Sequence, residues 1–183
     1  MNFEFNILYY IRSFQNPILN NIMTFITRLG NGGTIWILIA LLLLLNKNKE
    51  RKRLAFTIFL ALIIEVILGS MILKPIFRRN RPCWLVNLPL LIKTPRDYSF
   101  PSGHSASSFA ASYVIYKYKK SWGILSFVLA TLIGFSRLYH FVHFPTDVLG
   151  GIILGIGSAE ISLKILRRIQ GKLMKGKKLP SKN

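Results

Sequence analysis

The sequence has a single cysteine and few acidic residues. Because Cys83 is the only cysteine, the chain can form no disulfide within itself and can build neither a cysteine-rich zinc site nor an iron–sulfur cluster. Only 6 aspartates and glutamates stand against 25 lysines and arginines, which gives a formal net charge of +19. Such a charge can indicate nucleic-acid binding, but here the basic residues occur in short blocks between apolar segments. We therefore expect no nucleic-acid partner.

The apolar content is typical of a membrane protein. Hydrophobic residues make up 51% of the 183 residues, and the mean hydropathy is +0.41, which is high for a soluble domain. We interpret residues 1–183 as one all-α domain, an integral membrane bundle of six transmembrane helices. Several of the segments are shorter than the roughly 20 residues that cross a bilayer. The predicted spans are Ile18 to Leu29, Thr34 to Leu45, Leu54 to Leu73, Ser105 to Tyr118, Ser121 to Leu138 and Val148 to Leu166.

The two ends of the chain differ from these spans. Before Pro17, apolar residues lie among Asn6, Arg12 and Gln15, which predicts a short interfacial helix that the proline stops. This segment lacks the pattern of a cleaved signal peptide, so we expect it to be retained. Residues 171–183 are basic and are expected to form a flexible tail attracted to anionic lipid headgroups.

The basic blocks predict how the spans are oriented. Five lysines and arginines lie in residues 46–53, three in 117–120 and eight from Lys164 onward. By the positive-inside rule these connections are cytoplasmic, which places both termini inside if Ile18 to Leu29 is a span. Residues 30–33, 74–103 and 139–147 would then face outward.

The outward stretch 74–103 contains five prolines. Irregular backbone at membrane depth is tolerated only where protein or water satisfies its polar groups, so this spacing indicates a shaped functional loop. The stretch is also basic, which suits an anionic ligand; we expect four of its cations to be solvated or headgroup-facing. The prolines are Pro75, Pro82, Pro89, Pro95 and Pro101, and the four cations are Arg78, Arg79, Lys93 and Arg96.

Three polar clusters lie on this predicted outer side. They are Lys74 with Arg81 and Pro82, then Pro101-Ser102-Gly103-His104, and finally Ser136-Arg137 with His143 and Asp147. Arginine and lysine hold phosphate oxygens, and backbone N–H groups of Ser102 and Gly103 at a helix start would point at an anion. Two histidines can supply a nucleophile and an acid, and Asp147 could orient a histidine. The residues alone do not distinguish His143 from His140 as the nucleophile.

Taken together, Lys74-x6-Arg81-Pro82, Pro101-Ser102-Gly103-His104 and Ser136-Arg137-x5-His143-x3-Asp147 resemble the three-part signature of the type 2 phosphatidic acid phosphatase superfamily, which includes the vanadium haloperoxidases. All eleven signature positions match in order. The resemblance implies a membrane lipid phosphatase that needs no metal or cofactor. It also implies that His143 becomes phosphohistidine, that Asp147 orients it and that His104 is the general acid. By the same resemblance, the phosphate is held by Lys74, Arg81, Ser102, Gly103 and Arg137.

The resemblance leaves the substrate open. A site at headgroup depth on the outer face suits a lipid phosphate whose tail stays in the bilayer, and the family favours undecaprenyl diphosphate. Phosphatidylglycerol phosphate, phosphatidic acid and lipid A 1-phosphate are alternatives. Haloperoxidase chemistry is a further alternative, although its enzymes are typically soluble. A lipid-binding or transport protein is the non-enzymatic alternative, but the intact His104, His143 and Asp147 argue against it.

Two other polar features have simpler interpretations. His140-x2-His143 with Asp147 has a spacing that zinc could use, but the surrounding arginines and lysines favour an anion over a cation. We therefore expect no metal and interpret His140 as a structural or rim residue. Glu65 is expected about 13 Å deeper in the membrane than Lys74, at 1.5 Å per helical residue, where we expect it to make a buried hydrogen bond.

Overall fold

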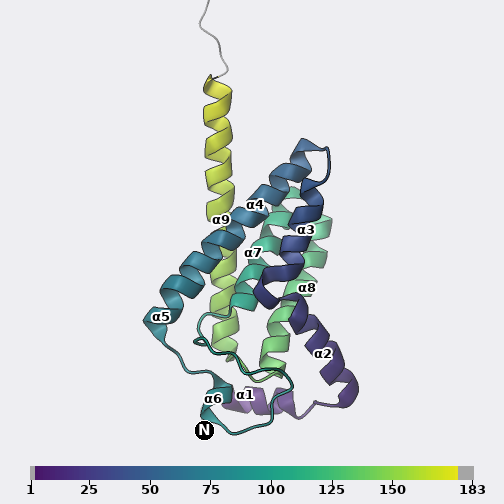
Figure 1. Cartoon of the computed structure of the whole chain (residues 1–183), viewed down its shortest axis with the longest axis vertical. Coiled ribbons are helices and arrows are strands. Elements are labelled where there is room, and N and C mark those ends of the chain that lie inside the picture. The colour runs from purple at the N-terminus through teal and green to yellow at the C-terminus, as the bar shows by residue number, and fades with distance from the viewer. Residues whose placement is uncertain (1–2, 177–183) are drawn as a thin grey trace, which may run out of the picture.

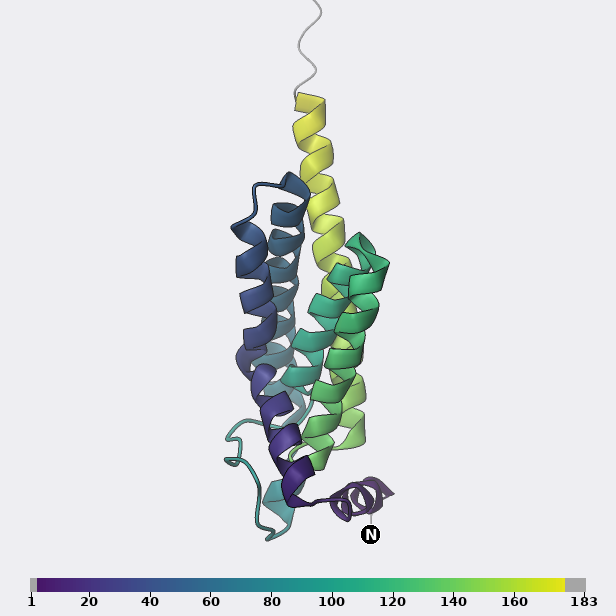
Figure 2. The same ribbon diagram turned by 90° about the vertical axis from the view of Figure 1, so that its right-hand side faces the viewer.

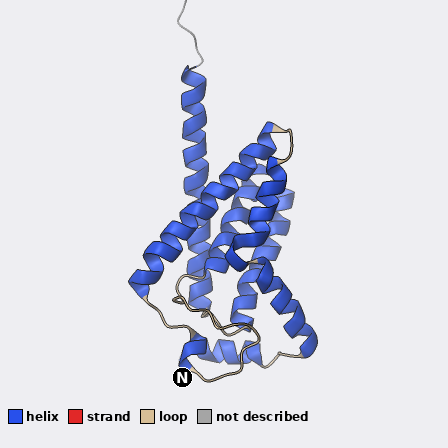
Figure 3. Ribbon diagram, in the orientation of Figure 1, coloured by secondary structure: helices blue, strands red, loops and turns tan. Residues whose placement is uncertain are grey.

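The protein is a bundle of helices arranged along one long axis (Figure 1). The computed structural model describes residues 3–176, and within this range helices and irregular connections occur without any strand (Figure 3). The all-α prediction is confirmed. The elements are α1 (Phe3–Arg12), α2 (Pro17–Leu29), the 3-10 helix η1 (Asn31–Gly33), α3 (Thr34–Leu44), α4 (Lys49–Glu65), the π-helix η2 (Val66–Leu73), α5 (Lys74–Phe77), α6 (Pro82–Leu85), α7 (Gly103–Tyr118), α8 (Lys120–Tyr139) and α9 (Pro145–Gly176).

Helix α7 lies at the centre of the bundle, packed against α4, α8 and α9. Small residues allow the close approach of α7 and α9. A Cβ added at Gly155 would lie 2.3 Å from the backbone oxygen of Ala106, and one at Gly151 would lie 2.5 Å from that of Ser102. No larger side chain fits at either position, which is the small-residue packing common between membrane helices. This contact fixes the start of α7 against the start of α9.

The outer surface of the bundle is apolar. Phe56, Leu125 and Ile153, from three different helices, are 57%, 70% and 74% exposed. Apolar surface of this extent on a monomer indicates contact with something other than water, and lipid chains meet that requirement. The surface agrees with the prediction of a membrane protein.

The prediction of six membrane-spanning helices is not confirmed. Within the described residues, three helical stretches are long and apolar enough to cross a membrane: Lys49–Leu85, Lys120–Tyr139 and Pro145–Gly171. Helices α2 and α3 add a fourth only if they count as one span, bent by 49°. They were predicted to cross in opposite directions, but η1 is a kink and not a reversing turn, so α3 continues in the general direction of α2 (Figure 2).

This kink changes the expected position of the N-terminal segment. Helix α1 lies across one end of the bundle, whereas the C-terminal half of α9 projects from the other end (Figures 1 and 2). The first and last described residues are therefore at opposite ends, which does not fit the prediction that both termini share one side. Helix α9 also continues to Gly176, past the predicted start of the flexible tail at Gly171, while residues 177–183 lie outside the described range.

The predicted N-terminal helix is confirmed as α1. It ends at Arg12, and the next helix begins at Pro17, where the side chain of Asn16 accepts a hydrogen bond from the Leu19 N–H at 3.0 Å. This is an N-cap followed by a proline at the first helical position. Leu8 of α1 is completely buried, in a cluster with Phe141 and Phe144. Helix α1 is thereby packed on the connection between α8 and α9, which carries His143.

Candidate active site

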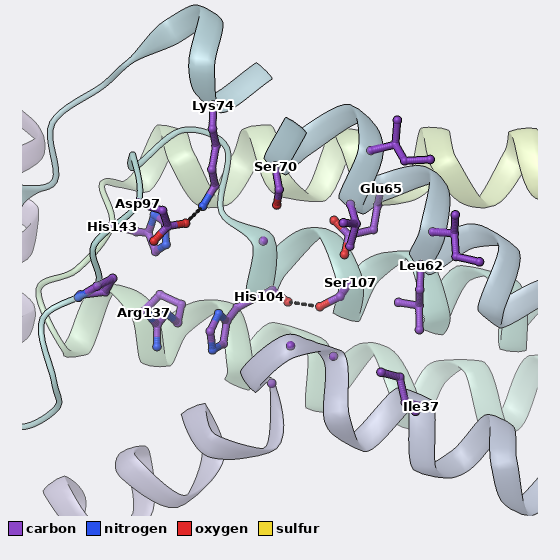
Figure 4. A pocket seen from close by; sticks show the side chains of 18 of the residues that line it. Ile37, Leu62, Glu65, Ser70, Lys74, Asp97, His104, Ser107, Arg137 and His143 are labelled. Carbon is purple, nitrogen blue, oxygen red and sulfur yellow. Dashed lines mark hydrogen bonds and ion pairs between the residues drawn. The ribbon is translucent and has the colours of Figure 1, made fainter. Parts of the chain in front are cut away.

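A cavity of about 540 Å³ brings the three predicted clusters together (Figure 4). It lies at the end of the bundle where the loop before α7 meets α4, η1 and α8. Ser102 and Asp147 do not line it but are fully buried. The other six predicted site residues do line it: Lys74, Arg81, Gly103, His104, Arg137 and His143.

The environment of His143 defines its protonation. Nη1 of Arg81 lies 3.0 Å from His143 Nε2, and because a guanidinium can only donate hydrogen bonds, Nε2 must be the acceptor. The ring proton then sits on Nδ1, which lies 3.4 Å from Ser99 Oγ and 3.5 Å from Asp147 Oδ2. Burial, together with the charges of Arg81 and Arg137, holds the pKa of His143 well below its usual value. The histidine is therefore neutral, and the lone pair of Nε2 accepts from Arg81.

Asp147 is completely buried and has a partner for each oxygen. Its Oδ1 accepts from Arg79 Nη1 at 2.7 Å, while Oδ2 accepts from the Ser99 hydroxyl at 2.5 Å and from the Phe144 N–H at 2.8 Å. A buried carboxylate is costly unless it is paired and hydrogen-bonded. These contacts hold its Oδ2 3.5 Å from His143 Nδ1. Ser99 was not identified from the sequence.

The start of α7 differs in part from the prediction. The Ser102 hydroxyl accepts from the Ser105 N–H at 3.4 Å, as an N-cap does, and the Ser102 N–H donates to the carbonyl oxygen of Asp147 at 3.0 Å. The expectation that the Ser102 N–H points at a bound anion is therefore wrong, because the chain itself uses that donor. Gly103 lines the cavity, and as the first residue of α7 its N–H has no acceptor within the helix.

The η1 kink holds His104 in place. Nε2 of His104 lies 3.0 Å from the side-chain oxygen of Asn31, which can only accept, so Nε2 carries the proton in this contact. A Cβ at Gly30 would lie 2.8 Å from His104 Cδ2, so only glycine allows the kink to approach the histidine this closely. Asn31 was missed because residues 30–33 were assigned to a surface connection.

Asp97 is the main acidic residue that sequence reasoning missed. Its Oδ2 forms an ion pair with Lys74 (Figure 4). Its Oδ1 accepts from Arg81 Nη2 at 2.9 Å. Burial raises the pKa of Asp97, but the hydrogen bond from Lys74 and the charges of Lys74 and Arg81 outweigh it and lower the pKa to about 2. The ionised carboxylate thus lies between two of the predicted phosphate ligands. The sequence contained a signal for this pairing, since Asp97 is the only acidic residue between Lys74 and Gly103.

Glu65 lines the same cavity as Lys74 and is 5% exposed. The prediction assumed a regular α-helix between the two residues, but Val66–Leu73 forms a π-helix. Its i→i+5 hydrogen bonds put more residues in each turn, which changes the rotation between Glu65 and Lys74. Both side chains therefore reach the cavity, so Glu65 lines the site itself, while its depth of about 13 Å relative to Lys74 stays a prediction.

His140 lies apart from the cavity. It is buried, with its ring at a right angle to that of Tyr139 and a centroid distance of 5.7 Å. This position agrees with a structural role. Within residues 3–176, no group of three or more His, Cys, Asp and Glu side chains is arranged to hold a metal ion.

Comparisons with known proteins give a consistent result. Residues 52–170 match the model of the PAP2 superfamily. The undecaprenyl-diphosphatase of Sulfolobus acidocaldarius is 33% identical over 154 residues, which cover 82% of this chain and 72% of that protein. The crystal structure of Aquifex aeolicus LpxE matches with a TM-score of 0.77 and 30% identity, over 90% of this chain and 96% of that chain. A PAP2 type phosphatidylglycerolphosphate phosphatase from Bacillus subtilis matches with a TM-score of 0.71 and 28% identity, over 91% and 85% of the two chains.

Proposed function

The chain belongs to the PAP2 superfamily, and from this premise we propose that His143 attacks the terminal phosphorus of a lipid diphosphate, with undecaprenyl diphosphate as the preferred substrate. The protein is a multi-pass membrane protein and a lipid phosphatase. What remains to be proposed is the role of each residue, the substrate and the orientation in the membrane.

One observation carries the proposal: the lone pair of His143 Nε2 lies in a cavity that Lys74, Arg81 and Arg137 also line. A neutral imidazole is a nucleophile, and three cations can stabilise the charge on the equatorial oxygens of phosphorus. The N–H of Gly103 adds a donor at the positive end of α7. When a phosphate binds, Arg81 turns from Nε2 to a phosphate oxygen, which frees the lone pair for attack.

The reaction then follows two steps. In the first, a bond forms between Nε2 and phosphorus while the bond to the leaving oxygen breaks, and His104 gives that oxygen a proton. Asp147 stabilises the positive charge that develops on the His143 ring. In the second, His104 accepts a proton from water, which attacks phosphorus and breaks the bond to Nε2. Ser102 supports both steps indirectly, by capping α7 and holding the backbone of Asp147.

The cavity wall supports a lipid substrate. Ile63, Val66 and Ile67 line the cavity and are also 55%, 46% and 44% exposed on the apolar surface. An acyl or prenyl chain can therefore leave the cavity between these residues and remain in the bilayer. A volume of about 540 Å³ suits a phosphorylated headgroup and the first part of a chain.

The choice among lipid phosphates follows from the relatives. The relative with 33% identity is named an undecaprenyl-diphosphatase, and the cationic side of the cavity suits the added charge of a diphosphate. Phosphatidylglycerol phosphate is the second candidate, because a phosphatase of that name shares the fold at 28% identity.

The charges at the two ends support an outward-facing site. The basic connection before α4, the one between α7 and α8, and the C-terminal half of α9 lie at one end (Figures 1 and 2). Toward the other end lie the start of α7 and the connection before α9, which carry the cavity residues Gly103, His104 and His143. Under the positive-inside rule the first end is cytoplasmic. We place α1 and the site on the outer side and the C-terminal end inside, which revises the expectation that both termini are cytoplasmic.

Phosphate release by the purified protein in nanodiscs tests the proposal. Undecaprenyl diphosphate should be hydrolysed with a higher kcat/KM than phosphatidylglycerol phosphate or phosphatidic acid, and EDTA should leave the rate unchanged. His143→Ala should abolish release from all three lipids. A different order of substrates would change the substrate assignment alone, whereas loss of activity in EDTA with rescue by zinc or magnesium would overturn the proposed mechanism.

A further inference from the structure

The N-terminal helix contacts the site through Arg79, a residue that the proposed chemistry does not use. We propose that Glu4 of α1 and Arg79 form a clamp that positions Asp147, so that α1 is part of the active-site machinery. This inference rests on the proposed function, because it assumes that Asp147 orients the nucleophile His143. Neither Glu4 nor Arg79 lines the cavity, so both act through Asp147.

The guanidinium of Arg79 lies between two carboxylates. Its Nη1 donates to Asp147 Oδ1 at 2.7 Å and to Thr146 Oγ1 at 2.5 Å, while its Nη2 donates to Glu4 Oε2 at 2.5 Å. The face of the guanidinium lies over the ring of Phe144, 4.3 Å from its centroid, a favourable cation–π position. The expectation that Arg79 is solvated or headgroup-facing is therefore wrong: its side chain is 28% exposed, but its guanidinium is bound to both carboxylates.

Arg79 binds the carboxylate oxygen of Asp147 that does not face His143. Oδ2 faces Ser99 and His143, and Oδ1 accepts from Arg79. Because the side chain of Asp147 is 0% exposed, its charge depends on a cationic partner. With Oδ1 held by Nη1 of Arg79, and Oδ2 held by Ser99 and the Phe144 N–H, the carboxylate is kept from rotating about its Cβ–Cγ bond, and Oδ2 stays directed at His143 Nδ1.

Glu4 in turn fixes Arg79 and the start of α9. Its Oε1 accepts from the Thr146 N–H at 3.2 Å and from the Thr146 hydroxyl at 2.7 Å. One glutamate thus binds both the arginine and the residue next to Asp147. The apolar face of α1 adds to this, since Phe5 packs edge-on to Phe144 with centroids 5.2 Å apart. Helix α1 is consequently attached to the catalytic segment by polar and apolar contacts together.

Charge-removing variants at both positions test the clamp. Arg79→Gln should lower kcat about tenfold to a hundredfold, the range seen when partners of active-site ligands are removed, and Arg79→Lys should recover part of it. Glu4→Gln, which leaves the Arg79 contact to Asp147 in place, should lower kcat roughly fivefold, as expected for the loss of one partly buried ion pair. KM should stay within about twofold in all three, because neither residue touches the substrate.

The chain offers matched controls. Arg78 is the exposed neighbour of Arg79, and its side chain donates to the Pro75 carbonyl at 3.0 Å. Glu50, in the first turn of α4 at the other end of the bundle, pairs with Arg53 at 3.8 Å. Arg78→Gln and Glu50→Gln should keep the wild-type kcat. If Arg79→Gln does not fold, the kcat of Glu4→Gln tests the clamp instead. This variant removes a partly exposed charge and leaves the buried Asp147 paired with Arg79.

Amide hydrogen exchange separates this inference from the proposed function. In Glu4→Gln, the amides of Phe144, Thr146 and Asp147 should exchange faster than in the wild type, whereas Glu50→Gln should leave them unchanged. If the wild type releases phosphate while Glu4→Gln and Arg79→Gln retain its kcat and its exchange rates, the clamp is refuted and the proposed function stands. If the wild type releases no phosphate from any lipid, the proposed function fails, and the exchange rates alone decide whether Glu4 holds the segment around Asp147.

Discussion

Nη1 of Arg81 lies 3.0 Å from Nε2 of His143, within a site where both side chains are almost completely buried. The contact places a permanent cation against the atom proposed to attack phosphorus. It disfavours protonation of the histidine and, at the same time, covers its lone pair until an anion draws the guanidinium away. The nucleophile is thereby kept neutral but protected in the free enzyme.

The pH dependence of kcat/KM should reveal this contact. Burial and the charges of Arg81 and Arg137 lower the pKa of His143, so the neutral, attacking form persists as the pH falls below 6.5. Activity should decline only as the pH passes through the depressed pKa. The acid limb of kcat/KM should therefore lie below pH 6.5. Because a group of the enzyme sets this limb, its midpoint should be the same for two substrates whose phosphates have different pKa values. An acid limb at or above pH 6.5 would contradict the assignment.

Asp97 should compete with phosphate. Its carboxylate binds Lys74 and Arg81, so a bound anion must share or replace these contacts. Asp97→Asn removes the charge and retains the shape, and it should strengthen inhibition by orthovanadate about tenfold, since a charge-assisted contact contributes on the order of 1.4 kcal/mol. Inhibition constants for the wild type, Asp97→Asn and the distant control Glu50→Gln measure this. Weaker inhibition in Asp97→Asn would show instead that Asp97 organises the two cations.

Loss of His104 should depend on the leaving group. An alkyl lipid phosphate has a strongly basic leaving oxygen, so His104→Ala should lower its turnover by roughly 10² to 10⁴-fold, the usual contribution of a general acid. An aryl phosphate with an acidic phenol should lose far less, and a lipid diphosphate should fall between them. Asn31→Ala removes the partner of His104 Nε2 and should show the same order with smaller losses. Equal losses for alkyl and aryl substrates would exclude His104 as the acid.

The orientation can be tested with single thiols. Cys83 lies in α6, at the same end of the bundle as α1 (Figure 1), and a membrane-impermeant maleimide should label it in intact cells. In a Cys83→Ala background, Asn6→Cys in α1 should be labelled in intact cells as well. Ser121→Cys, near the start of α8 at the opposite end, should react only after permeabilisation. Labelling of Ser121→Cys in intact cells would reverse the orientation, and protection of Asn6→Cys alone would place α1 on the cytoplasmic side.

Much of the site could be predicted because its residues lie in three local spacings that resemble the signature of a known family, and that resemblance alone selects His143 over His140. Pro101-Ser102-Gly103-His104 starts a helix, and His143 and Asp147 flank the start of another, so each pair of residues is positioned by its own backbone. The helices themselves follow from apolar segments of sufficient length and from capping residues such as Asn16 and Ser102. These signals are local, so the amino-acid sequence by itself determines the helices and the short spacings within them.

Only the tertiary structure decided which distant segments come into contact. Glycines at residues 30–33 suit a reversing turn as well as a kink, and packing against His104 selects the kink. Asp97 reaches Lys74 across 23 residues, and Glu4 reaches Arg79 across 75; no periodic pattern marks such pairs, because they depend on where distant backbones meet. The π-helix between Glu65 and Lys74 likewise changes which side chains share a face. Such pairing of charges is a property of the assembled bundle, since only the completed fold brings these side chains together and shields partners such as Lys74 and Asp147 from water.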